Sequence, residues 1–162
     1  MKERTRLSIS FELNGSPRRI EVEAHRTLLS VLRDDLGTVD VKEGCDEGVC
    51  GTCTVLLDGR AVSSCLVLAP RVHGARITTL LGLSPDGRPH PLKEMFVRHG
   101  AVQCGFCTPG MVLTAYAFVR SHPQTTRQEL RKALAGNLCR CTGYAKLLDA
   151  VEAYVREVCS VR

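Results

Sequence analysis

The chain of 162 residues contains no tryptophan, and only 4% of its residues are aromatic. A core built from large aromatic rings is therefore excluded, and small domains of this kind commonly need a metal or another staple. No apolar run reaches the roughly 18 residues that a membrane-spanning helix requires, so no such helix is expected. Residues 1–6 contain neither an apolar signal core nor a twin-arginine pair. We therefore expect a cytoplasmic protein.

The sequence also lacks a dense basic run, although its formal net charge is +5. Arg71, Arg76 and Arg88 are dispersed among apolar residues, and few aromatic side chains are available to stack on bases. Surfaces that bind nucleic acid usually combine clustered basic residues with such stacking groups. We therefore expect no nucleic-acid partner.

Cysteine, by contrast, is abundant, with nine residues in the chain. An odd number of cysteines without an export signal argues against a disulfide framework. Eight of the nine form two compact sets, the first spaced C-x4-C-x2-C-x11-C and the second C-x2-C followed, after a long gap, by C-x-C. The first set is Cys45, Cys50, Cys53 and Cys65, and the second is Cys104, Cys107, Cys139 and Cys141.

The first set opens with the spacing of plant-type [2Fe–2S] ligands. Gly44, Gly48 and Gly51 permit positive φ angles, which would let backbone amides wrap a negatively charged cluster. A hairpin turn at residues 58–59 would fold Cys65 back beside this loop. A zinc site with four cysteine ligands is the alternative, but zinc ribbons prefer two C-x2-C pairs.

The second set places two cysteines just before each of two expected helices, which begin near Thr108 and after Tyr144. Helix N-termini offer free N–H groups and the positive end of a dipole to an anionic cluster. Four such ligands also suit tetrahedral zinc, so zinc stays a stronger alternative here. Two four-thiolate [2Fe–2S] centres would carry about −2 each when oxidised and would leave the protein nearly neutral.

The first half of the sequence has the pattern of a small sheet. Residues 7–13 alternate, with Leu7, Ile9, Phe11 and Leu13 on one face, and a return strand begins at Ile20. A helix over residues 28–36 follows, capped by Thr27 and stopped by Gly37; a second hairpin covers 54–57 and 60–64, and a last strand covers 77–81. Two strands, a helix and two strands is the order of a β-grasp fold.

The second half changes to helical periodicity after a segment rich in glycine and proline. Helices are expected over 92–99, 108–120, 127–134 and 147–158, the third with a Thr126–Glu129 capping box. The predicted class is α+β, a ferredoxin-like β-grasp domain followed by a four-helix bundle. The predicted boundaries are residues 1–82 for the first domain, 83–91 for the linker and 92–162 for the second domain.

Four segments together carry a family resemblance: G-C-D-E-G-V-C-G-T-C-T-V, S-S-C-L, Q-C-G-F-C-T-P-G-M and G-N-L-C-R-C-T-G-Y. They resemble the small iron–sulfur subunit of the xanthine oxidase family of molybdenum hydroxylases. The resemblance runs in the right order from about Leu7 to Val158. One departure is Thr52, where the family more often has alanine or serine.

The resemblance implies one [2Fe–2S] cluster on each cysteine set, and an approach of Gln103 and Cys141 to a molybdopterin by hydrogen bonds. It implies an electron-transfer subunit that passes electrons from the molybdopterin centre, through the helical-domain cluster and then the β-grasp cluster, to a flavin. Substrate chemistry would lie elsewhere, since the expected partners are a large molybdopterin-binding subunit and a medium FAD-binding subunit in a dimer of heterotrimers. A free-standing ferredoxin and a zinc-stabilised interaction module are the other hypotheses. Cys159 belongs to neither set and is expected to be a free thiol.

Overall fold

The computed structural model describes residues 5–159, and the side chain of Cys159 lies outside the described part. Its N-terminal half is a five-stranded mixed sheet in the order β2-β1-β5-β3-β4. β1 and β5 run parallel, whereas the other neighbouring pairs are antiparallel. The strands are β1 (Arg6–Leu13), β2 (Ser16–Glu23), β3 (Thr54–Leu57), β4 (Arg60–Ser63) and β5 (Arg76–Thr78).

The alternation in β1 places Ile9, Phe11 and Leu13 in the core of the sheet domain, as predicted. Leu7, which shares this alternation, is 40% exposed because it lies near the start of the strand. The core therefore does not reach the first residue of the predicted alternating set. The two-residue alternation of a strand predicts the face on which a side chain lies, but not whether the core extends far enough to cover it.

The helix that crosses the sheet is short. Thr27 caps α1 (Leu28–Ser30), where its hydroxyl accepts a hydrogen bond from the Ser30 N–H at 3.2 Å. The chain continues as a wider π turn over Val31–Asp35. Gly37, with φ of 64°, ends it in the left-handed region where glycine is favoured, as predicted.

The last strand is shorter than predicted. The sequence predicts a strand over residues 77–81, but β5 ends at Thr78. The side chain of Asn14 then accepts a hydrogen bond from the Thr79 N–H at 2.8 Å and donates one to the Thr79 hydroxyl at 3.0 Å. These bonds replace the sheet ladder, and the chain turns through a 3-10 segment at Leu81–Leu83.

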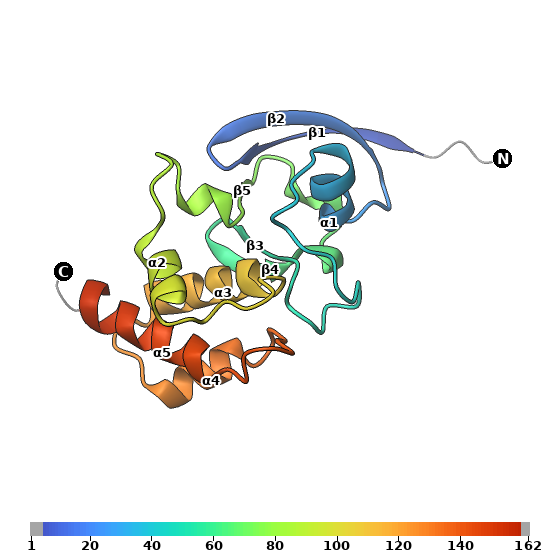
Figure 1. Ribbon diagram of the computed structural model, residues 1–162. Helices are drawn as coiled ribbons and strands as arrows, with labels where there is room; N and C mark the ends of the chain where they lie inside the picture. The colour runs from blue at the N-terminus through green and yellow to red at the C-terminus, as the bar shows by residue number, and fades with distance from the viewer. Residues whose placement is uncertain (1–4, 160–162) are drawn as a thin grey trace.

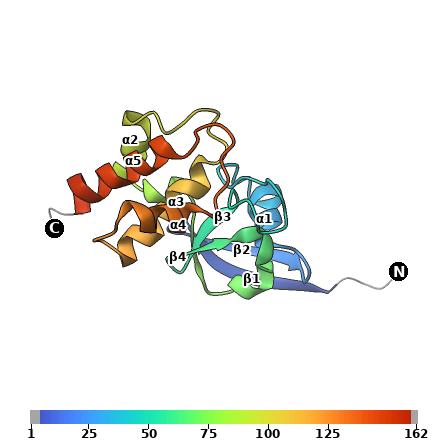
Figure 2. The ribbon, with the colours of Figure 1, turned by 90° about the horizontal axis from the view of Figure 1, so that it is seen from below.

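Four helices form the C-terminal half, and α3 lies between the sheet and the other helices (Figure 1). α3 contacts β3 and β4 on one side and α2 and α4 on the other, while α5 contacts α2 and α4. Figure 2 shows the same arrangement from below, with α1 and α5 at opposite ends. The helices are α2 (Pro91–Arg98), α3 (Thr108–Ser121), α4 (Arg127–Leu134) and α5 (Ala145–Tyr154), the last extended by a π turn over Val155–Cys159.

Each half has its own hydrophobic core, but the two cores do not divide at the end of the sheet. Leu56, in β3, is 3% exposed and packs with the helices rather than with the sheet core. Leu83 joins the same helical core. The sheet therefore contributes one of its own apolar side chains to the second half.

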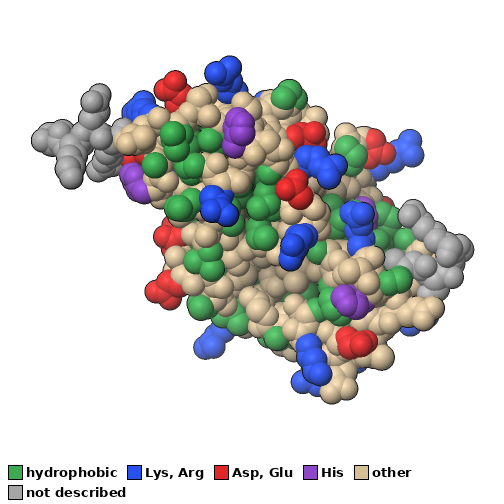
Figure 3. Space-filling model, turned by 180° about the vertical axis from the view of Figure 1, so that it is seen from behind, with side chains coloured by type: hydrophobic (Ala, Val, Ile, Leu, Met, Phe, Trp, Pro, Cys, Tyr) green, Lys and Arg blue, Asp and Glu red, His purple; other side chains and the backbone are tan. Residues whose placement is uncertain are grey.

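The charged side chains form no single basic patch on the face seen in Figure 3. Lys and Arg side chains are scattered there among Asp, Glu and apolar groups. None of the helices within residues 5–159 combines the length and apolar character needed to span a bilayer.

The capping box of α4 is formed as predicted, and it allows a local test. The Thr126 hydroxyl accepts from the Glu129 N–H, and the Glu129 carboxylate accepts from the Thr126 N–H at 2.7 Å, which lowers the pKa of that carboxyl. Thr126→Ala is expected to lower the free energy of unfolding by about 1 kcal/mol, the usual value of an N-cap. Urea denaturation followed by circular dichroism measures this. Thr125→Ala, one residue outside the cap, should cost less; equal losses would contradict the capping role.

Candidate metal centres

The four cysteines of the first set converge at one end of the sheet. Cys45, Cys50 and Cys53 lie on the loop before β3, and Cys65 lies in the 3-10 turn that follows β4. The β3–β4 hairpin pairs Thr54 with Ser63 and so returns Cys65 to Cys53. The Ser64 hydroxyl donates to the Cys53 carbonyl at 2.7 Å.

The sulfurs of this set meet in two pairs. The Cys53 and Cys65 sulfurs are 3.5 Å apart, and the Cys45 thiol is hydrogen-bonded to Cys50. The two pairs also interact, because, besides burial, the charge of Cys45 raises the pKa of Cys65. The loop and the 3-10 turn after β4 thus bring together four sulfurs from residues up to 20 positions apart in the chain.

The glycines of the loop act in two different ways. Gly48 and Gly51 have φ of 78° and 68°, as predicted for a loop that turns its amides inward. Gly44 does not adopt a positive φ, and its requirement is close approach: a Cβ there would lie 2.7 Å from the Thr52 hydroxyl oxygen and 3.0 Å from the Cys50 sulfur. One amide, the Glu47 N–H, points to the Cys45 sulfur at 3.4 Å.

The second set has the same paired geometry. The Cys104 and Cys141 sulfurs are 3.6 Å apart, and Cys107 is hydrogen-bonded to Cys139. Cys107 directly precedes α3, and the loop containing Cys139 and Cys141 leads into α5. The two pairs also interact. Besides burial, the charge of Cys104 raises the pKa of Cys107, and besides the hydrogen bond to Cys104, the charge of Cys139 raises the pKa of Cys141.

Burial and hydrogen bonding shift the pKa values of individual thiols in opposite directions. Burial raises the pKa values of Cys65 and Cys107 to about 12, and in both cases the neighbouring thiol adds to the increase. The Cys45 pKa is instead lowered to about 7, mainly by the hydrogen bond from the Glu47 N–H. The Cys65 and Cys107 thiols are therefore protonated at neutral pH without metal, so metal binding must release these two protons.

The donor sets fit a two-iron cluster. A [2Fe–2S] centre needs two thiolates on each iron, and the sulfurs meet in such pairs. Beside the second set, the buried Thr108 hydroxyl has no partner among the described residues, which leaves a donor for a non-protein acceptor.

Two hydrogen bonds join the loops of the two sets. The Leu138 N–H donates to the Cys50 carbonyl at 2.9 Å, and the buried Asn137 side chain donates to the Gly51 carbonyl at 2.9 Å. The two loops therefore touch at Cys50 and Gly51 of the first and at the two residues that precede Cys139 in the second. The sequence pattern did not reveal Asn137 as an interdomain residue, because nothing local marks a contact across 86 positions.

Removing the Asn137 amide tests this junction. Asn137→Ala removes one hydrogen bond to the buried Gly51 carbonyl, which still accepts from the Thr54 hydroxyl at 2.7 Å, so the cost is that of one hydrogen bond, about 0.5–1.5 kcal/mol. We expect a loss of that size in the free energy of unfolding, measured by urea denaturation. Leu138→Ala is the matched control, because that side chain is 53% exposed and its backbone hydrogen bond persists. Equal losses in both variants would contradict the role of the amide.

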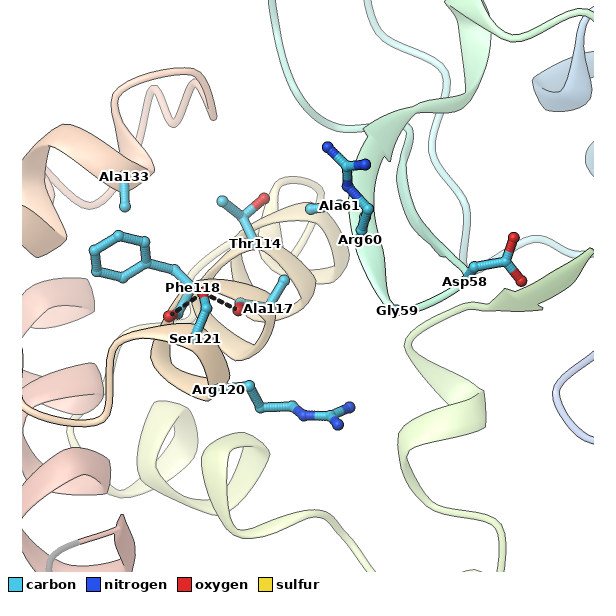
Figure 4. A pocket seen from close by; sticks show the side chains of 10 residues that line it. All are labelled: Asp58, Gly59, Arg60, Ala61, Thr114, Ala117, Phe118, Arg120, Ser121 and Ala133. Atoms are coloured by element: carbon cyan, nitrogen blue, oxygen red, sulfur yellow. Dashed lines mark hydrogen bonds between the residues drawn. The ribbon is translucent and has the colours of Figure 1, made fainter.

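Gln103, predicted to approach a molybdopterin, is exposed together with its neighbour Cys104 and with Cys141. A cavity of about 670 Å³ lies elsewhere, between the β3–β4 turn and α3, and is lined by Asp58, Arg60 and Arg120 among others (Figure 4). Its lining contains no cysteine. The cavity is therefore not the metal site.

Two sets of four cysteines, with their sulfurs in pairs, have the number and type of ligands that iron–sulfur clusters require. Comparison with known proteins agrees: residues 11–77 match the family described as 2Fe-2S iron-sulfur cluster binding domain, and residues 79–152 match the [2Fe-2S] binding domain family. The chain belongs to the family of small iron–sulfur subunits of the xanthine oxidase-type molybdenum enzymes.

The relatives cover nearly the whole chain. The small FeS subunit of nicotinate dehydrogenase from Eubacterium barkeri is 47% identical over 155 residues, which are 96% of this chain and 98% of the relative. The xanthine dehydrogenase iron-sulfur-binding subunit of Escherichia coli O157:H7 is 42% identical over 148 residues, covering 90% and 92%. A chain of quinoline 2-oxidoreductase from Pseudomonas putida 86 superimposes with a TM-score of 0.91 at 43% identity, covering 96% and 97%.

These findings confirm the predicted role. The chain is the electron-transfer subunit of a multi-subunit molybdenum oxidoreductase, and it binds two [2Fe–2S] clusters. They favour the subunit over a free-standing ferredoxin. In the aldehyde oxidoreductase of Desulfovibrio gigas, the same fold occupies 18% of a longer chain, with a TM-score of 0.90.

Proposed function

We propose that Cys45, Cys50, Cys53 and Cys65 hold one cluster and that Cys104, Cys107, Cys139 and Cys141 hold the other. The pairing of the sulfurs is the observation that supports this assignment most directly. In the first set, Cys45 and Cys50 would bind one iron, and Cys53 and Cys65 the other. In the second set, the corresponding pairs are Cys104 with Cys141 and Cys107 with Cys139.

The domain boundaries follow the same division. Residues 1–82 form the first domain, 83–91 the linker and 92–162 the second domain. The first is a β-grasp fold, supported by the mixed sheet with α1 in its crossover, and the second is a four-helix bundle, supported by the contacts among α2, α3, α4 and α5.

The helical-domain cluster faces the molybdopterin of a large subunit, and Gln103 and Cys141 contact the pterin by hydrogen bonds. Their exposure, together with that of Cys104, supports this placement, since the second set has one edge open to a partner. The β-grasp cluster faces the FAD of a medium subunit. Val49 and Leu66, 60% and 66% exposed beside the first set, supply an apolar surface for that contact.

When bound, each cluster supplies a one-electron redox centre. The cysteines and their loops fix the two centres relative to each other, and the Cys50–Leu138 hydrogen bond maintains that spacing. Burial of Cys53, Cys65 and Cys107 excludes water from one side of each centre. Electrons pass from the molybdenum centre through both clusters to the flavin, and substrate chemistry takes place on another subunit.

The complete assembly is a cytoplasmic dimer of heterotrimers, consisting of this chain and the large and medium subunits. The subunit designations of the relatives support a complex with partner chains. Size-exclusion chromatography of native protein tests it: the chain should elute with its partners. A stable monomer that carries no partner would sink this assignment.

Metal analysis tests the cluster assignment. Two [2Fe–2S] centres predict about four iron and four sulfide per chain. Plasma emission spectroscopy and a sulfide assay on protein purified without oxygen measure both. Stoichiometric zinc without sulfide would replace this proposal with the zinc-stabilised module, to which the same cysteines could belong.

A further inference from the structure

A threonine hydroxyl is hydrogen-bonded to a cysteine sulfur of the second set. The Thr142 hydroxyl donates to the Cys139 sulfur at 3.1 Å. The same oxygen accepts a hydrogen bond from the Tyr144 N–H at 3.4 Å. Because the Tyr144 amide occupies a lone pair, the single hydroxyl proton of Thr142 is directed to the sulfur.

The first set has the same contact. The Thr52 hydroxyl lies 3.2 Å from the Cys50 sulfur, and the Thr52 side chain is 6% exposed. Its other contact is the Lys42 carbonyl at 3.5 Å, which is at the limit of a hydrogen bond. A sulfur that binds iron as a thiolate has no proton, so the hydroxyl must be the donor. The bare Cα of Gly44 leaves the space that this hydroxyl occupies.

We propose that Thr52 and Thr142 are positioning residues that each raise the reduction potential of one cluster through a hydrogen bond to a ligand sulfur. The proposal rests on the cysteine assignment of the preceding section. Reduction adds negative charge, which spreads onto the sulfurs. A donor aimed at a sulfur therefore stabilises the reduced cluster more than the oxidised one.

The two threonines can be tested separately in one protein. In the full-length chain carrying both clusters, Thr142→Val should lower the potential of the helical-domain cluster alone, and Thr52→Val that of the β-grasp cluster alone. The expected change is about tenfold in the equilibrium constant for reduction, or about 59 mV for one electron. Redox titration monitored by EPR resolves the two signals, and the unaltered cluster is the internal standard.

Three further variants separate tuning from structure. Thr142→Ser and Thr52→Ser keep a hydroxyl and should keep the wild-type potentials. Thr54→Val removes a hydroxyl that donates to the Gly51 carbonyl rather than to a sulfur, so it should leave both potentials unchanged. If a valine variant fails to load its cluster, the corresponding alanine variant provides the measurement, with the same decrease expected.

The outcomes distinguish this inference from the proposed function. Potentials that stay unchanged in fully loaded valine or alanine variants would overturn the tuning role and leave the ligand assignment intact. Serine variants that shift as far as the valine variants would also overturn it. A wild-type chain without iron and sulfide would instead overturn the proposed function, and the inference with it.

Discussion

Replacing Cys139 with serine is expected to remove one of two EPR signals and to halve the iron and sulfide content, from about four of each per chain to about two. Cys139 is paired with Cys107, so its loss leaves one iron of that cluster with a single thiolate. The first set is built on a different loop and should keep its cluster. EPR of the dithionite-reduced protein, with iron and sulfide analysis, provides the measurement.

Cys159→Ser is the natural control, because that cysteine belongs to neither set. It should leave both signals and the full iron content in place. Two persistent signals in the Cys139 variant would show that the ligands are partitioned differently. Loss of both signals would show that the two loops do not assemble independently.

Gly110→Ala is expected to destabilise the junction of the two halves strongly. Gly110 lies in the first turn of α3, where a Cβ would collide with the Gly51 carbonyl oxygen. Alanine is the better helix former by about 1 kcal/mol, which alone would favour the substitution. The collision is with rigid backbone, and overpacking costs about 1–3 kcal/mol or more.

The clash also moves the acceptor of the Asn137 hydrogen bond, so the loss of stability in Gly110→Ala should exceed that in Asn137→Ala. Gly136→Ala is the matched control, since a Cβ there meets nothing within 4 Å. Urea denaturation of the three variants gives the order. A Gly110→Ala protein as stable as wild type would mean that the two halves pack less closely than the structure indicates.

Local signals in the sequence predicted what local forces decide. The Thr126–Glu129 spacing gave a capping box because both hydrogen bonds close within one turn of helix. Pro109 marked the start of α3, because the first turn of a helix does not use the N–H group that proline lacks. The cysteine spacings identified both sets, since the hairpin that returns Cys65 is itself a local structure.

Contacts between the halves could not be predicted in this way. β5 stops at Thr78 because Asn14, 65 positions from Thr79, binds the next residue. Leu56 sits in a strand with an ordinary apolar pattern, and only the packing of α3 decides which core receives it. From the sequence, Gly110 is only a poor helix former, whereas the structure places the Gly51 carbonyl against it. The local sequence around each of these residues does not identify its distant contact.

The placement of Leu56 has a consequence for dissecting the protein. The matched families divide the chain between residues 77 and 79, but its packing does not divide there. A fragment ending at that boundary would expose Leu56 and the Gly51 carbonyl to water, and the complementary fragment would have a hole where Leu56 had been. The two halves match separate families, but neither half keeps its packing complete without the other.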